Sequence, residues 1–183
     1  MVCGAAGCSG SSAAPAVAPG GGTGSADSQP SIVSITAVTA TTSPAVALAA
    51  AIDSCTAVTQ AEAGAALGQS VRAPVMGKAT VEGGIACVFY GPSVPVGADP
   101  DIPVADSVRV VLVTGTQALT YFTNYKSKVP AQTIAGYGDQ AYYDGSASFS
   151  VLKGSDYIRI AVIGVPDVLK PEEQLASDAL PGM

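Results

Sequence analysis

Two aspartates, Asp139 and Asp144, flank the pair Tyr142-Tyr143 and are the residues best spaced for catalysis. Two carboxylates on either side of a sugar, with aromatic rings for stacking, are the machinery of many glycoside hydrolases. Each aspartate also has a structural explanation. Asp139 lies between a glycine and an apolar run, and Asp144 precedes Gly145, as turn aspartates often do. We favour turn roles for both and keep a carboxylate-based hydrolase as an alternative.

Four tyrosines are candidates for lining a ligand groove: Tyr137, Tyr142, Tyr143 and Tyr157. A tyrosine offers an apolar ring and a hydroxyl, a combination that suits a glycan, a lipid or a peptide. The alternative is that these are ordinary half-exposed side chains of a sheet.

The composition excludes most other chemistries. The 183 residues include no His and no Trp, which removes Ser-His-Asp and Cys-His catalysis and His-ligated metals. No C-x-x-C pair, P-loop or G-x-S-x-G motif occurs. Asp99, Asp101 and Asp106 lack the spacing of a calcium loop, so we interpret them as a solvated acidic loop. We expect no cofactor and no metal, and the net charge of -6 argues against nucleic acid as a partner.

The four cysteines stand at positions 3, 8, 55 and 87. The small residues 5–7 before Cys8 resemble a lipobox, in which a bacterial signal peptidase cleaves before a cysteine that becomes lipidated. Lipidation of Cys8 would discard Cys3 and leave Cys55 and Cys87. We expect these two to form a disulfide, as an oxidising compartment permits. The alternative is two reduced, buried thiols.

The chain divides into three parts. We interpret residues 1–8 as the remnant of a lipoprotein signal, because they lack the basic and apolar regions of a full export signal. Residues 9–52 have the Ala, Ser, Thr, Gly and Pro content of a tether, although residues 32–38 are apolar enough to add an edge strand to the domain. Residues 31–52 make a poor membrane span, since half of their apolar residues are Ala, hydroxyl side chains interrupt them and Pro44 lies near the middle. Residues 53–183 hold 21 of the 22 charged residues and predict one globular domain.

Local patterns predict the elements of this domain. A capping box at 59–62 begins a helix that ends at Gly68, and Pro171 followed by two glutamates opens a last helix. The Pro-rich, acidic stretch 91–106 predicts a long loop. Helical periodicity predicts a middle helix over 117–129. Alternation of apolar and polar residues, together with turn signals, predicts six strands: 75–81, 85–90, 107–114, 140–143, 147–152 and 157–163.

Strands joined by hairpins, with helices between the groups, predict a single α+β domain rather than a parallel α/β sheet. The expected fold is an antiparallel sheet of about five to six strands with two or three helices, in the order α-β-β-β-α-β-β-β-α.

Several short motifs occur together in this order: Asp53-Ser54-Cys55-Thr56, Thr59-Gln60-Ala61-Glu62, Ala65-Ala66-Leu67-Gly68, Cys87-Val88-Phe89-Tyr90 and Gly136-Tyr137-Gly138-Asp139-Gln140-Ala141-Tyr142-Tyr143. From about Asp53 to Leu180 the chain resembles a family of actinobacterial cell-envelope lipoproteins of unknown function. In that family a Cys before a T-x-A-E-type helix pairs with a later strand Cys, and a G-x-G-D-x-A-Y-Y segment precedes the closing hairpin. The resemblance implies an envelope location and a fold type. It implies no active site, because the family has no agreed activity.

The leading hypothesis is a non-enzymatic, lipid-anchored protein at the outer face of the cytoplasmic membrane. Its domain would bind an extracytoplasmic ligand or protein and touch the membrane through the lipid alone. Two alternatives remain: an envelope hydrolase using Asp139 and Asp144, and a sensor or assembly accessory acting through a protein interface.

Overall fold

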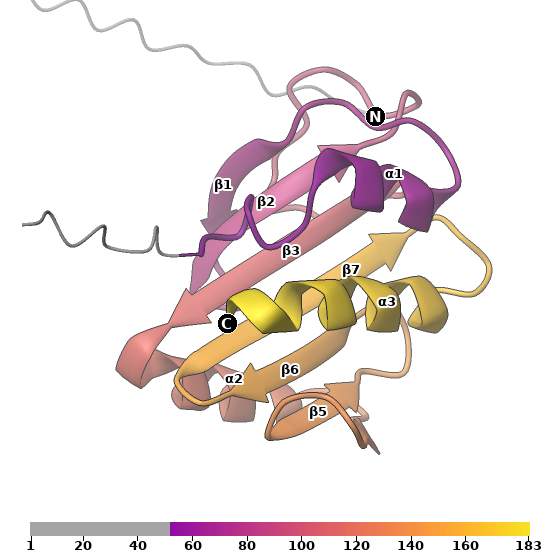
Figure 1. The fold of residues 1–183 in the computed structure, drawn as a ribbon. Helices are drawn as coiled ribbons and strands as arrows, with labels where there is room; N and C mark the ends of the chain where they lie inside the picture. Colours follow the sequence, from indigo (N-terminus) through magenta and orange to yellow (C-terminus); the bar gives the residue numbers. More distant parts are fainter. Residues whose placement is uncertain (1–51) are drawn as a thin grey trace, which may run out of the picture. The chain divides into compact units, whose positions relative to one another are not determined.

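The computed structural model describes residues 52–183. Cys8, the signal remnant 1–8, the predicted strand 32–38 and the tether up to residue 51 lie outside the described residues. Figure 1 shows the described part, in which one sheet runs across the domain with helices packed on it. Within residues 52–183, no helix is both long enough and apolar enough to span a membrane.

The sheet has seven strands in the order β1-β2-β3-β7-β6-β5-β4, and every neighbouring pair is antiparallel. The strands are β1 (Val75–Ala79), β2 (Gly84–Tyr90), β3 (Ser107–Thr114), β4 (Gln132–Ile134), β5 (Gln140–Tyr143), β6 (Phe149–Lys153) and β7 (Asp156–Ile163). The α-helices are α1 (Gln60–Leu67), α2 (Ala118–Lys126) and α3 (Leu169–Ala179), and short 3-10 turns η1 (Gly115–Gln117) and η2 (Leu180–Gly182) adjoin α2 and α3.

The predicted α+β class is confirmed, with three helices and the order α-β-β-β-α-β-β-β-β-α. The expected strand number was too low, because β4 was not predicted. β4 has only three residues, two of them exposed and polar, so it carries no apolar alternation. The larger of the other differences are at element ends: β1 ends at Ala79 rather than 81, α2 ends at Lys126 rather than 129, and β6 begins at Phe149 rather than 147.

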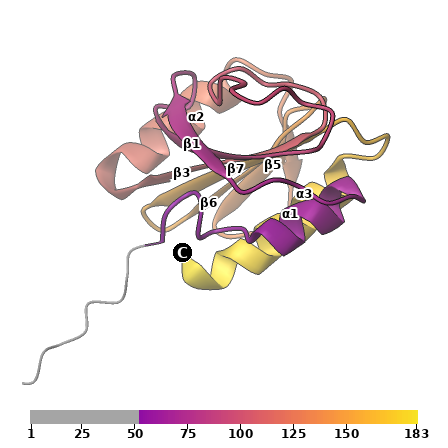
Figure 2. The ribbon, with the colours of Figure 1, turned by 90° about the horizontal axis from the view of Figure 1, so that it is seen from above.

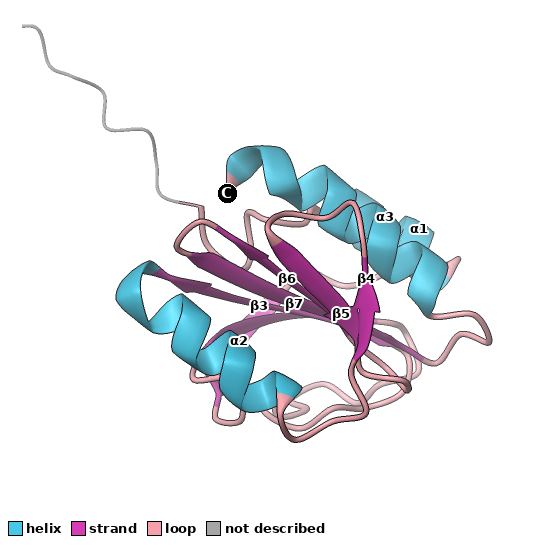
Figure 3. Cartoon of the chain, turned by 90° about the horizontal axis from the view of Figure 1, so that it is seen from below, coloured by secondary structure: helices cyan, strands magenta, loops and turns pink. Residues whose placement is uncertain are grey.

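Helices cover both faces of the sheet. Figures 2 and 3 show α1 and α3 side by side on one face and α2 on the other. The α1/α3 face buries one set of strand side chains, among them Phe89, Val110, Phe149 and Ile160. The α2 face buries the alternate set, including Val111 and Tyr157, against Phe122 of α2 and Val94 of the 91–106 loop. The central strands are therefore covered on both sides, as the burial of nearly all of β3 indicates.

A disulfide and the hydrogen bonds of one serine attach the start of the domain to the sheet. The predicted disulfide is present: Cys55 and Cys87 join the segment before α1 to β2, with their Cα atoms 5.1 Å apart. Beside it, the Ser54 hydroxyl donates to the carbonyl of Ile85 (2.5 Å) and accepts from the amide of Leu112 (3.0 Å). The segment before α1 is thus attached to both β2 and β3.

The predicted capping box is also confirmed. The amide of Glu62 donates to the Thr59 hydroxyl, and the Glu62 carboxylate accepts from the amide of Thr59. At the other end of α1, Gly68 adopts the left-handed conformation (φ 69°) that ends a helix without strain.

Candidate functional site

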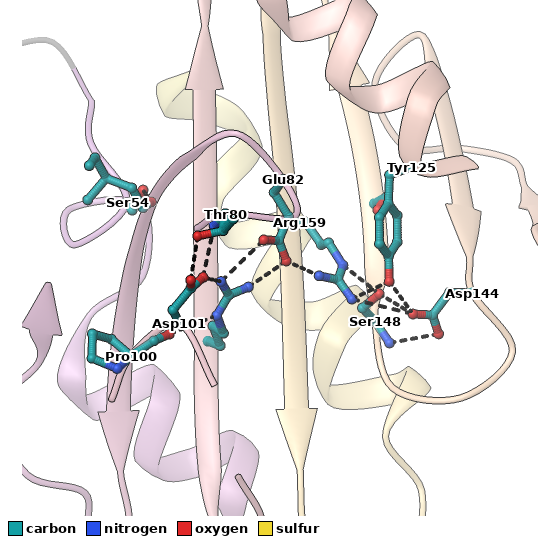
Figure 4. A network of polar contacts seen from close by, with 12 residues as sticks. Ser54, Thr80, Glu82, Pro100, Asp101, Tyr125, Asp144, Ser148 and Arg159 are labelled. Carbon is teal, nitrogen blue, oxygen red and sulfur yellow. Dashed lines mark hydrogen bonds and ion pairs between the residues drawn. The ribbon is translucent and has the colours of Figure 1, made fainter. Parts of the chain in front are cut away.

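A buried network of charged side chains lies on the α2 face of the sheet (Figure 4). Its centre is Glu82, in the turn between β1 and β2. Arg109 of β3 donates to both carboxylate oxygens of Glu82, at 2.5 and 3.2 Å, and Arg159 of β7 donates to one of them. The Glu82 and Arg109 side chains are 2% and 4% exposed, so this carboxylate is bound by two guanidinium groups away from water.

The network extends in both directions from Glu82. On one side, Asp101 of the 91–106 loop accepts from the amide and hydroxyl of Thr80 and lies 3.8 Å from the Arg109 guanidinium. On the other side, Arg159 donates to the hydroxyls of Ser148 (2.8 Å) and Tyr125 (2.5 Å). The network thereby links the β1-β2 turn, the long loop, α2 and the central strands.

Asp144 closes the network at the start of the β5-β6 turn. Its carboxylate accepts from the Ser148 hydroxyl (2.5 Å) and from the amides of Ser146, Ala147 and Ser148, and it lies 3.6 Å from Arg159. Burial raises the pKa of Asp144, but these hydrogen bonds outweigh burial and hold the pKa below its ordinary value. The predicted turn role is confirmed, with an ion pair added to it.

The ionisation of Glu82 follows the same logic. Burial raises the pKa of Glu82. The Arg109 hydrogen bonds and the charge of Arg159 lower it by more than burial raises it, so the pKa lies below its ordinary value. A carboxylate held ionised between two guanidinium groups is a poor proton donor or acceptor near neutral pH. The contacts of the network suit a role in holding the β1-β2 turn, the long loop and the central strands together.

A third buried acid, Glu172 of α3, lies on the opposite face. One of its oxygens accepts from the amide of Val162 (3.0 Å), and the other has no hydrogen-bond partner among residues 52–183. Burial raises the pKa of Glu172 to about 8, although the Val162 amide acts in the opposite direction. Glu172 is fully buried, which keeps a substrate from reaching it, and its raised pKa favours the uncharged acid at neutral pH.

The four candidate tyrosines do not share one groove. Tyr142 and Tyr157 are fully buried on the α2 face, with ring centroids 5.0 and 5.6 Å from that of Phe122. Tyr137 and Tyr143 pack partly buried against the core of the other face. Adjacent residues of a strand point to opposite faces, so Tyr142 and Tyr143 are separated by the sheet itself. Tyr137 lines an open cavity of about 320 Å³ formed mainly by residues 133–141.

The two candidate catalytic aspartates are not a pair. They stand at opposite ends of β5, five residues apart, which in an extended strand separates their Cα atoms by roughly 16 Å. Asp144 is buried in the network above, whereas Asp139 is exposed and accepts from the amide of Gly154 (2.6 Å). The loop aspartates are dispersed too: Asp101 binds Thr80, and Asp106 binds Gln69 and Ser93. Among residues 52–183, no three acids or cysteines gather as a metal site would require.

Exposed apolar side chains, by contrast, gather at one side of the domain. Of the seven large exposed apolar residues in the described chain, six lie on β1, the turn after it, the start of β2 and the 91–106 loop. We call these six residues the β1-edge surface: Val75, Met76, Val81, Ile85, Val96 and Ile102. Val96 is 92% exposed and Met76 58% exposed. Alternation places Met76 on one face of the sheet and Val75 on the other, so these side chains border the β1 edge from both faces. Exposed apolar side chains along one edge make this side of the domain a candidate protein interface.

Two shallow cavities adjoin the β1-edge surface. One, of about 440 Å³, is open to solvent and lined by residues between 93 and 105 of the loop, including Val96 and Ile102. The other, of about 160 Å³, lies between Val75, Val96 and Tyr90, with the Arg72 guanidinium 5.7 Å from the Tyr90 ring centroid. A third cavity, of about 200 Å³, lies between α1 and α3 and is below the range of about 300–1,000 Å³ that small-molecule sites occupy.

Comparison of the chain with protein-family models, with curated proteins and with solved structures finds no match. The function must therefore be inferred from the residues themselves. Sequence reasoning missed Glu82, Arg109 and Arg159. A usable signal was present for the arginines, because each is the lone basic residue inside an apolar strand, SVRVVLVT or DYIRIAVI. Buried charges need partners, and such isolated arginines predict a buried acid.

Proposed function

We propose that this chain is a non-enzymatic lipoprotein of the cell envelope, anchored through Cys8 at the outer face of the cytoplasmic membrane. Its domain binds a protein partner through the β1-edge surface. The observation that carries the binding role is that, of the seven large exposed apolar side chains in residues 52–183, six lie at this side of the domain.

Three features support the envelope location. The Ala5-Ala6-Gly7-Cys8 sequence has the form of a lipobox, and a tether-like composition follows it. The Cys55–Cys87 disulfide is typical of proteins that fold outside the reducing cytoplasm. The resemblance to actinobacterial envelope lipoproteins agrees with both.

A protein partner suits this surface better than the membrane does. The 91–106 loop carries Val96 and Ile102, but it also carries Asp99, Asp101 and Asp106 and contains no Lys or Arg. Anionic lipid head groups attract basic segments and repel such a loop. The loop is therefore suited to a partner that buries valine and isoleucine without presenting a dense negative charge.

The test is mass spectrometry of the protein recovered from the membrane fraction of its native host, without reduction. We expect a lipidated N-terminal Cys8 and a Cys55–Cys87 peptide. Cys8→Ala should release the protein from the membrane fraction, whereas the matched control Cys3→Ala should leave it there, since Cys3 precedes the cleavage site. A cytosolic protein with an unmodified Cys8 would overturn the proposal.

A further inference from the structure

Helix α3 is attached to the sheet by few polar contacts. It lies over β6 and β7 (Figure 1) and buries its apolar side chains in the core of the α1/α3 face. Within residues 52–183, the hydrogen bonds that join α3 and the adjoining η2 to the sheet involve the side chains of two residues. Lys153 of β6 donates to two carbonyl oxygens at the C-terminal end, and Glu172 accepts from β7 at the N-terminal end.

Glu172 takes the place of a strand carbonyl beside the end of β7. β6 pairs with β7 only as far as Ile160, so the amide of Val162 lies beyond that pairing and donates to the Glu172 carboxyl group instead (3.0 Å). A buried amide left without an acceptor is costly. Glu172 satisfies this amide only while its side chain stays between α3 and the sheet.

The environment of Glu172 suits a neutral acid and not a charged one. The side chain is fully buried, and one of its oxygens has no hydrogen-bond partner among residues 52–183. Burying an unpaired carboxylate costs far more than burying the protonated acid. No Lys or Arg of the described chain forms an ion pair with Glu172. An ionised Glu172 would therefore be relieved by moving its side chain into water.

Charged groups on the surrounding elements do not compensate an ionised Glu172. They are engaged elsewhere or exposed to water: Arg159 of β7, Asp144 after β5, Lys153 of β6, Glu62 of α1 and Lys170 of α3. Burial is the main cause that raises the pKa of Glu172; Asp144 raises it further and Arg159 lowers it, both from the network on the other face. Tyr143 of β5 is a neutral neighbour, since burial and the Glu172 charge both raise the pKa of its hydroxyl.

We propose that Glu172 controls the docking of α3 in a pH-dependent way. The protonated side chain holds the first turn of the helix on β7. Loss of its proton to water moves the carboxylate out of the core and releases the helix, which uncovers part of the apolar core that α3 buries. This conformational change is independent of the proposed binding role, because it involves none of the six residues of the β1-edge surface.

The pH range of the release follows from linkage. The pKa of Glu172 is about 8 in the docked state and about 4.3 where the side chain is in water. Between these values the docked state binds one proton more than the released state. The equilibrium constant for release therefore rises about tenfold per pH unit as pH increases from about 5 to 8.

Hydrogen exchange of individual amides, measured by NMR at pH 6 and pH 8, tests the proposal. The sample is the full chain in a Cys3→Ala/Cys8→Ala background, which prevents stray disulfides and lipidation. After correction for intrinsic exchange rates, the protection of the Val162 amide and of the α3 amides should fall about a hundredfold. The amides of α2, a helix of similar length on the other face, are the matched control and should keep their protection. Glu172→Gln should abolish the change in α3.

Three results would overturn the proposal. Equal protection of α3 at both pH values would show that the helix stays docked whatever the charge of Glu172. An equal fall in the wild type and in Glu172→Gln would assign the change to another group. A parallel fall in α3, α2 and β3 would mean that the whole domain opens at once, so that α3 has no release of its own. The comparison of α3 with α2 in the wild type decides the matter even if Glu172→Gln does not fold.

Discussion

Arg109 donates two hydrogen bonds to Glu82, one to each carboxylate oxygen, across 27 positions of sequence and away from water. A bidentate guanidinium-carboxylate pair is both stronger and more directional than a single bond. Because Glu82 lies in the turn after β1, this pair holds the β1-β2 hairpin over the α2 face of the sheet. Arg159 binds the same carboxylate from β7.

Replacing Glu82 by Gln should destabilise the domain strongly. The change leaves two buried guanidinium groups without their shared counter-ion, and breaking a buried ion pair in this way costs about 3–5 kcal/mol. Urea unfolding of Glu82→Gln measures the loss. Asp178→Asn is the matched control, because Asp178 is exposed and, within the described part of the chain, its side chain accepts only from Gln174. Equal losses for the two variants would show that the network contributes little.

The buried acid on the other face predicts how stability depends on pH. Burial raises the pKa of Glu172 to about 8, above the value of about 4.3 in an unfolded chain. Between these values the folded state binds one proton more than the unfolded state, so the free energy of unfolding falls as pH rises. The fall should reach about 1.4 kcal/mol per pH unit and about 5 kcal/mol in total. The chain contains no histidine, whose titration would otherwise add to the pH dependence in this range.

Glu172→Gln supplies the control for that measurement. The amide stays neutral at every pH and keeps an oxygen for the Val162 amide, so its unfolding free energy should be nearly flat from pH 5 to 8. Urea titrations of both proteins at unit pH steps give the comparison. A wild-type curve as flat as that of the variant would mean that Glu172 titrates normally.

Much of the sheet could be predicted because its strands carry clear patterns. Ser107–Thr114 and Gln140–Tyr143 have the bounds that alternation and turn signals indicate, and the cysteine count indicated the disulfide. The network could not be predicted in full, because Glu82 lies 77 positions before Arg159 and only the order of strands brings them together. Side chains alternate between the two faces of a strand, and this alone places Tyr142 and Tyr143 on opposite faces. The hypothesis of a groove shared by these two tyrosines could therefore have been excluded from the sequence.

Loss of the disulfide should destabilise the domain by an amount set mainly by loop closure. Cys55 and Cys87 are 32 positions apart, and the chain-entropy model then assigns the cross-link about 3–4 kcal/mol. Cys55→Ala/Cys87→Ala should lose this much in urea unfolding, and reduction of the wild type should lose a similar amount. Alkylation without reductant checks the premise, since modification at both positions would show that no bridge forms.

The glycines of the Gly136-Tyr137-Gly138-Asp139 segment should respond differently to substitution. Both have positive φ, 95° at Gly136 and 50° at Gly138. A Cβ at Gly136 meets no heavy atom within 4 Å, whereas one at Gly138 would lie 2.5 Å from the carbonyl oxygen of Leu152. That oxygen is not free to move, because it accepts from the amide of Asp139 (2.8 Å).

Gly136→Ala should therefore cost about 1 kcal/mol, the ordinary penalty of a left-handed conformation. Gly138→Ala adds a backbone clash to the same penalty and should cost about 2–4 kcal/mol. Urea unfolding of the two variants, each measured against the wild type, shows whether the backbone conformation alone or also the clash with Leu152 requires glycine. If the losses are equal, backbone conformation alone explains the two glycines. If Gly138→Ala costs more, the second glycine is required because β6 approaches the segment closely at Leu152.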